Sequence, residues 1–150
     1  MITKKIVTAS RSETIALAKS LGELITKPIT ILLRGELAAG KTTFVQGLAL
    51  GLGVTTKVSS PTFTIMKVYE GRLTIYHLDC YRLEGINQDL GFEEYLNDDG
   101  ICVIEWPDYI RNLLPDECIE IEIINTGEDN REIKVIANGD YNEQLVEELL

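Results

Sequence analysis

The feature that most constrains this 150-residue chain is a strand-length apolar run that leads directly into a glycine-containing loop. The run is Ile29–Arg34 (ITILLR), and its continuous apolar character is typical of a buried central strand. The loop Gly35–Gly40 follows, and Thr42–Leu52 then carries apolar side chains at helical spacing up to Gly53. The sequence therefore predicts a strand, a loop and a helix in immediate succession.

The loop fits the pattern G-x-x-x-x-G-K-[ST], because residues 35–42 read GELAAGKT. In such a loop the backbone N–H groups point at phosphates, and Gly40 lets the backbone approach them closely. Lys41 reaches the β- and γ-phosphates, the Thr42 hydroxyl binds Mg²⁺, and the positive end of the helix faces the anion. A buried strand before the motif and a helix after it are what this mechanism requires. We therefore predict a nucleoside triphosphate site here.

The remaining pattern predicts hairpins and further helices rather than a repeated strand–helix unit. The expected strands and helices follow in chain order. They are a strand over Ile2–Thr8, a helix from Ser10 or Ser12 to about Ile25, a hairpin of Thr62–Tyr69 with Leu73–Asp79, a helix over Gln88–Leu96, a strand over Ile101–Glu105, a short helix over Asp108–Leu114, a strand with Ile119, Ile121 and Ile123 buried, a strand over Arg131–Ala137 and a helix over Asn142–Leu150. This order favours one α/β domain over residues 1–150, with three layers and a mixed parallel and antiparallel sheet.

Charge is unevenly distributed along the chain. Its 14 basic and 24 acidic residues give a net charge of −10, with +5 in residues 1–57 and −15 in residues 58–150. Phosphate binding needs a cationic face, so the acidic second part argues against this chain holding RNA or DNA alone. The basic first part is still compatible with a small polyanion such as a nucleotide.

The chain is expected to be cytoplasmic and to have no membrane segment. Its N-terminus, MITKKIVTAS, lacks an apolar signal segment, and the longest apolar runs are far too short to span a bilayer. The three cysteines, Cys80, Cys102 and Cys118, are odd in number and widely spaced, and we interpret them as buried thiols.

Two acids follow apolar strands, where α/β folds place their sites. Asp79 ends the run Leu73–Leu78 and Glu105 ends Ile101–Ile104, so either could complete a Mg²⁺ shell, although either could also be a solvated strand end. His77 is more often structural than catalytic in such a position. On the residues alone, Trp106 could be a core residue or a partner anchor. The pair Tyr81–Arg82 could reach phosphate or lie on the surface.

Four segments together resemble one known family. GELAAGKTTF (35–44), SPTFT (60–64), YHLDCYRL (76–83) and VIEWP (103–107), in this order, are similar to the TsaE (YjeE) family of tRNA threonylcarbamoyladenosine biosynthesis. The resemblance covers about Ser10 to Ala137. It implies a P-loop ATPase that binds ATP with Mg²⁺ and acts on a complex of TsaB and TsaD. TsaD performs the transfer to tRNA, so this chain would meet tRNA only indirectly.

The resemblance also implies roles for particular residues. Lys41, Asp79 and Glu105 would be catalytic, and Thr42 with Glu105 would ligate Mg²⁺. Trp106 would be functional. The nucleotide would be held by Ser12 at the adenine side, the loop and helix start (Glu36, Leu37, Ala38, Ala39, Gly40, Lys41, Thr42 and Thr43), Thr62 and Asp79 near the γ-phosphate, and Arg131 in the late hairpin.

The loop departs from the usual family sequence at two positions, and the sequence leaves two other functions open. The family loop usually reads GDLGAGKT, whereas this chain has Glu36 and Ala38, and an alanine forced to positive φ would cost on the order of 1 kcal/mol. A small-molecule kinase could use the same phosphate loop. A nucleotide-gated binding module with negligible turnover is the other alternative.

Overall fold

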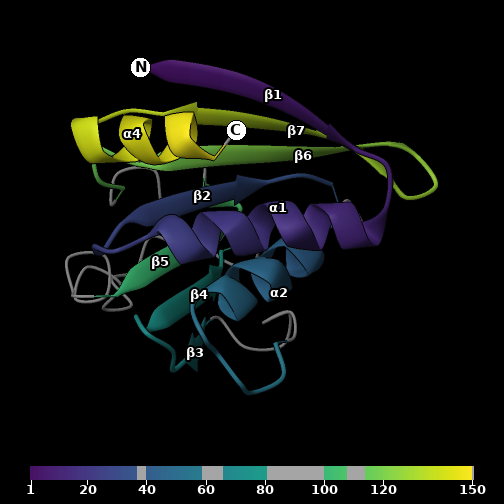
Figure 1. Ribbon diagram of the computed structural model, residues 1–150. Coiled ribbons are helices and arrows are strands. Elements are labelled where there is room, and N and C mark those ends of the chain that lie inside the picture. Colours follow the sequence, from purple (N-terminus) through teal and green to yellow (C-terminus); the bar gives the residue numbers. More distant parts are fainter. Residues whose placement is uncertain (37–39, 59–65, 81–99, 108–113, 150) are drawn as a thin grey trace.

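A computed structural model describes residues 1–36, 40–58, 66–80, 100–107 and 114–149. Within them a seven-stranded sheet carries helices on one face (Figure 1). The elements are β1 (Ile2–Thr8), α1 (Arg11–Leu24), β2 (Thr30–Arg34), α2 (Lys41–Gly51), β3 (Met66–Tyr69), β4 (Ile75–Asp79), β5 (Ile101–Glu105), β6 (Ile119–Gly127), β7 (Asn130–Ala137) and α4 (Asp140–Glu148).

The sheet is mixed, with parallel strands in its centre. Its order is β1-β7-β6-β2-β5-β4-β3, and β6, β2, β5 and β4 run parallel to one another. The pairs β1–β7, β6–β7 and β3–β4 are antiparallel. Because parallel strands share the direction of their carboxyl ends, β2, β4 and β5 all end at the same edge of the sheet, where an α/β fold presents its site.

The main core lies between the sheet and the three described helices. Figure 1 shows α1 and α2 side by side across the sheet, with α4 over β6 and β7. Alternation along each strand sends every second side chain into this core. The contributing strand residues include Ile31 and Leu33, Ile101 and Val103, and the alternating isoleucines 119, 121 and 123. A second apolar cluster of Leu32, Leu78, Cys80, Cys102 and Ile104 lies on the opposite face.

Helices α1 and α2 pack at unusually close range through glycine. A Cβ built on Gly47 of α2 would lie 2.5 Å from the carbonyl oxygen of Ile15, and one on Gly22 of α1 would lie 2.5 Å from that of Leu48. Real Cβ atoms essentially never make such short contacts. The two glycines therefore let the helix backbones touch, and this contact fixes the position of α2 relative to α1.

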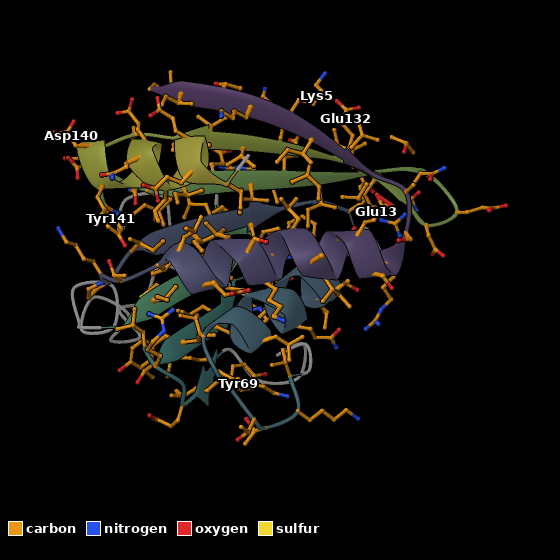
Figure 2. The ribbon with its side chains drawn as sticks, in the orientation of Figure 1. Lys5, Glu13, Tyr69, Glu132, Asp140 and Tyr141 are labelled. Atoms are coloured by element: carbon orange, nitrogen blue, oxygen red, sulfur yellow. The ribbon has the colours of Figure 1, made fainter. Side chains whose placement is uncertain are left out.

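The ends of α1 are held by side chains. Ser10 Oγ accepts a hydrogen bond from the Glu13 backbone N–H, which caps the helix, and the Glu13 carboxylate accepts one from the N–H of Ala9, the residue before the N-cap. At the other end the Tyr141 hydroxyl accepts from the backbone N–H of Thr26 at 2.7 Å. Figure 2 shows Tyr141 reaching from α4 towards this segment, and Glu13 at the opposite end of α1.

These observations confirm the expected α/β class, the mixed sheet and most predicted elements. Ser10, and not Ser12, caps α1. The predicted helices over 88–96 and 108–114 and the strand residues 62–65 lie wholly or largely outside the described residues. Cys80 and Cys102 are buried as expected, whereas Cys118 is only half-buried. Among the described residues, no helix combines the length and the apolar composition needed to cross a membrane.

Candidate functional site

The candidate site lies at the edge where β2, β5 and β4 end. The chain leaves β2 at Arg34 and enters α2 at Lys41, so the phosphate-loop motif joins a central parallel strand to a helix N-terminus. Gly40, the N-cap of α2, has a φ of 109°, a left-handed conformation that strains residues with a side chain. It also has no side chain that could cap the helix. The first N–H groups of α2 are therefore suited to an external anion.

Lys41 is buried and lies between an acid and an aromatic ring. Its Nζ is 3.7 Å from Oε1 of Glu105 and 4.3 Å from the centroid of the Trp106 ring. The side chains of Lys41 and Glu105 are only 7% and 5% exposed. A buried charge needs a partner, so Glu105 and Trp106 together stabilise the lysine ammonium at the loop.

The backbone of Trp106 adopts a conformation that is rare for a residue with a side chain. Its φ is 57°, immediately after β5 ends at Glu105. Such strain costs on the order of 1 kcal/mol or more and persists where its surroundings impose it. Here the turn accompanies the indole contact with Lys41. The structure thus links Trp106 to the loop lysine, which favours the functional interpretation of this tryptophan over simple core packing.

Three polar side chains of β4 and β5 lie on the helix-covered face of the sheet. Glu105 follows Ile101 and Val103 in the alternation of β5, and His77 and Asp79 follow Ile75 in β4. Asp79 and Glu105 are register partners at the ends of these neighbouring strands. This placement brings Glu105 into contact with Lys41 and sets Asp79 opposite Glu105, while the roles that the sequence predicts for the two acids stay predictions.

His77 was not expected to belong to the site. It is fully buried, and its Nε2 lies 2.6 Å from Oε2 of Glu105. The alternation of the strand could have revealed this position, because His77 shares the face of Asp79 two residues before it. A lone histidine in a strand, however, carries no indication of its partner.

A second group of residues approaches the loop from the β6–β7 hairpin and α1. A small pocket is lined by Arg11, Thr14, Gly40, Thr43, Asp129 and Arg131. The Nε of Arg131 lies 3.5 Å from the position that a Cβ on Gly40 would occupy. The Nη1 of Arg131 donates to the backbone carbonyls of Glu128 and Asn130, which hold the side chain beside the loop. The turn of the hairpin and the start of α1 lie at the same end of the molecule in Figure 1.

The other predicted site residues divide into three groups. Thr42 and Thr43 lie half-buried in the first turn of α2. Ser12 and Glu36 are exposed, and neither lines the pocket beside Gly40. Leu37, Ala38, Ala39 and Thr62 lie outside the described residues, as do Tyr81 and Arg82. The effect of Ala38 on the loop thus stays a prediction.

The electrostatic character of the site affects its neighbouring thiol. Burial, together with the nearby carboxylates of Asp79 and Glu105, raises the pKa of Cys80 to about 12. The thiol is therefore protonated at neutral pH and is a poor nucleophile. Two carboxylates, one lysine and a helix N-terminus meet at this edge, an arrangement suited to a cation and an anion bound together.

A comparison with protein families agrees with this geometry. The family described as Threonylcarbamoyl adenosine biosynthesis protein TsaE matches residues 8–133. The chain belongs to the TsaE family. Its TsaE-family relatives include a tRNA threonylcarbamoyladenosine biosynthesis protein TsaE of Bacillus subtilis, 48% identical over 144 residues, which span 95% of this chain and 90% of the relative. A protein of the same description from Treponema pallidum is 42% identical over 133 residues, or 87% of this chain and 98% of the relative.

A comparison with solved structures extends the likeness to three dimensions. The crystal structure of Bacillus subtilis YdiB superposes with a TM-score of 0.84 at 39% sequence identity, covering 99% of this chain and 94% of that one. The sequence resemblance to TsaE, drawn from four short segments, is thus confirmed over nearly the whole chain.

Proposed function

We propose that this TsaE-family chain is the ATP-binding and slowly hydrolysing subunit of a tRNA threonylcarbamoyladenosine modification system. In this proposal it binds ATP with Mg²⁺ and acts, in the cytoplasm, on a TsaB–TsaD-like complex that carries out the transfer to tRNA. The observation that carries the proposal is the buried Lys41 at the start of α2, held between Glu105 and Trp106 at the carboxyl edge of the parallel strands.

The residues present fit a magnesium nucleotide. Mg²⁺ takes oxygen ligands and commonly only one or two from protein, and the Thr42 hydroxyl and the Glu105 carboxylate are such donors. The first turn of α2 contains no acidic residue, so nothing in that turn repels a phosphate from its N–H groups. Bound Mg²⁺ would supply neutralising charge to the phosphate oxygens.

The chain's own side chains would then have separate tasks. Lys41 would donate to the phosphates as its ammonium turns from the Glu105 carboxylate. Asp79, only partly buried at the end of β4, would orient the attacking water. Arg131, held by its hairpin carbonyls beside Gly40, would place positive charge next to the loop. Phosphoryl transfer depends on such positioning and charge more than on covalent chemistry.

Substitution of the lysine tests the nucleotide site. Lys41→Ala removes a charge-assisted contact and should weaken ATP binding in calorimetry by about tenfold or more. Lys41→Arg is the matched variant, because it keeps a positive charge beside Glu105 while changing the geometry offered to phosphate. Thermal unfolding of both variants shows whether the protein stays folded when the buried Glu105 carboxylate loses its lysine partner. Unchanged ATP affinity in folded Lys41→Ala would contradict the proposal.

The fluorescence of Trp106 can be used to follow nucleotide binding. It is the single tryptophan of the chain, so intrinsic fluorescence reports on this position alone. Movement of the Lys41 ammonium away from the ring should change that fluorescence when ATP and Mg²⁺ are added. The same titration with Lys41→Ala should give no comparable change.

Turnover and the partner require a second experiment. Single-turnover ATP hydrolysis is measured for the isolated chain and for the chain with a TsaB–TsaD-like pair. We expect a slow rate alone and a faster one with the pair, since the transition state needs positive charge that a partner can complete. A fast rate that does not change with the pair would favour a stand-alone enzyme such as a small-molecule kinase. No turnover in either case would indicate a nucleotide-gated binding module.

A further inference from the structure

His77 is a fully buried polar residue that the proposed nucleotide contacts do not use. Its side chain is 0% exposed, and its Nε2 is 2.6 Å from Oε2 of Glu105. A buried imidazole without hydrogen bonds would cost more than the packing of an apolar side chain returns. The contact with Glu105 is therefore what makes a histidine acceptable at this position in the core.

The direction of this hydrogen bond follows from the other neighbours of the carboxylate. The second oxygen of Glu105, Oε1, faces the Lys41 ammonium at 3.7 Å, and a carboxylate beside an ammonium acts as an acceptor. The Nε2 of His77 is therefore the donor. In the part of the chain that the structure describes, the buried Nδ1 has no hydrogen-bond partner, so a proton placed there would find no acceptor. We assign the proton to Nε2.

The two oxygens of Glu105 consequently have different tasks. Oε2 is held by a side chain that is immobilised in the core of β4, whereas Oε1 is turned towards Lys41 and the phosphate loop. A carboxylate on a two-carbon side chain can otherwise rotate about its last bond and present either oxygen or both. Fixing one oxygen leaves a single oxygen in a defined position at the loop.

We propose that His77 is a positioning residue that orients the Glu105 carboxylate for the metal site. The inference rests on the proposed function, because it assigns Glu105 to Mg²⁺. Hydrogen-bonded neighbours of metal-ligating carboxylates commonly matter almost as much as the ligands, and their loss costs about 10–100-fold in metal affinity or activity. If His77 served only packing, an apolar side chain of similar size would replace it without affecting the metal.

Two substitutions at this position separate the hydrogen bond from the packing. His77→Leu fills much of the volume and removes the donor, whereas His77→Gln restores an amide N–H near the position of Nε2. Ile75→Ala is the control for packing, because Ile75 is fully buried on the same face of β4 and contacts the main core. Urea unfolding of all three variants shows how much each loses in stability.

The readout is the affinity for Mn²⁺, used as the metal probe, in the presence of ADP, followed by the paramagnetic resonance of free Mn²⁺. We expect His77→Leu to weaken Mn²⁺ binding by about 10–100-fold, His77→Gln to stay near the wild type, and Ile75→Ala to lose stability but keep its affinity. Wild-type affinity in folded His77→Leu, or equal losses in all three variants, would overturn the inference. A wild-type chain that binds no Mn²⁺ with ADP would overturn the proposed function itself, and this inference with it.

A spectroscopic measurement tests the same arrangement without any substitution. His77 is the only histidine of the chain, so ¹⁵N-histidine labelling gives one pair of imidazole signals that needs no further assignment. We expect the folded protein to show a proton on Nε2, and that signal to shift when Mg²⁺ and ADP are added. A proton on Nδ1, or an Nε2 signal unaffected by Mg²⁺ and ADP that do bind, would contradict the proposed role.

Discussion

Lys41 Nζ and Glu105 Oε1 lie 3.7 Å apart inside the protein, so the loop lysine and the strand-end acid neutralise each other. An incoming phosphate would compete with Glu105 for the ammonium, and an incoming cation would compete with Lys41 for the carboxylate. A magnesium nucleotide brings both competitors at once. The ion pair therefore suits a site in which the metal and the phosphates are bound together.

The two strand-end acids should matter more for hydrolysis than for binding. Glu105→Gln removes a proposed metal ligand, and Asp79→Asn removes the carboxylate proposed to orient water. Each should reduce the single-turnover rate by roughly a hundredfold, while the ATP affinity falls much less. Glu120→Gln is a suitable control, because Glu120 pairs with Arg34 on the opposite face of the sheet. Parental rates in both acid variants would show that these residues do not form the catalytic site.

The close contact of α1 with α2 predicts an intolerance of side chains at Gly47. Gly47→Ala would bring a methyl group to within 2.5 Å of the carbonyl oxygen of Ile15, so the two helices must separate. We expect a loss of about 1–3 kcal/mol in the free energy of unfolding, measured by urea denaturation. Leu50→Ala, on the exposed side of α2, should change it by much less. Equal stabilities for the two variants would contradict this packing.

Local patterns predicted the strands and helices well where each pattern had a single interpretation. The run at Ile29–Arg34, the alternation of Ile119, Ile121 and Ile123, and the helical spacing after Lys41 all correspond to observed elements. Each depends on period and burial within one segment, which the sequence displays directly. The phosphate-loop motif predicted its flanking strand and helix for the same reason, because its spacing expresses a local mechanism.

Contacts between distant segments could not be predicted in this way. Nothing near His77 indicates that Glu105, 28 residues later, accepts its hydrogen bond. The pairing depends on β4 and β5 being parallel neighbours in one particular register, which brings Asp79 opposite Glu105. The contact of Gly47 with α1 is similar, since a glycine within a helical pattern gives no sign of what lies against it.

The raised pKa of Cys80 predicts a loss of stability at alkaline pH. The unfolded thiol titrates near 9.0, whereas the folded one titrates at about 12. Between these values the unfolded chain has lost its proton and the folded chain has kept it, so the stability present below pH 9 declines as the pH rises towards 12. One such group gives a slope of at most about 1.4 kcal/mol per pH unit.

Urea unfolding at pH 8, 9 and 10 measures this slope. Cys80→Ala should remove part of the alkaline decline while also lowering stability at pH 8, where the thiol still packs in the core. Leu78→Ala is the control for lost packing, because Leu78 lies buried in the same apolar cluster and has no group that titrates. An alkaline slope that is identical in the wild type and in Cys80→Ala would show that Cys80 does not cause it.

Binding of tRNA by the isolated chain should be weak, because several of its basic side chains are already engaged and the chain is acidic overall. On the far face of the sheet, Lys5 pairs with Glu132 at 2.9 Å, and Figure 2 shows the two side chains together at β1 and β7. Arg34 pairs with Glu120 on the same face. The guanidinium of Arg72 donates to the carbonyl oxygens of Gly22 and Ile25 at the end of α1, and Lys41 belongs to the site.

Besides these contacts, the chain has a net charge of −10, the sum of +5 in residues 1–57 and −15 in residues 58–150. Each phosphate of an RNA backbone needs a lysine or arginine that is free to neutralise it, and the acidic residues repel the rest of the molecule. A tRNA gel shift at low salt is the most demanding test, because screening is weakest there. We expect no shift by the isolated chain, but a shift when a TsaB–TsaD-like pair is added. Tight binding by the isolated chain would contradict this prediction, because it would show that enough lysine and arginine side chains are available to bind the RNA phosphates.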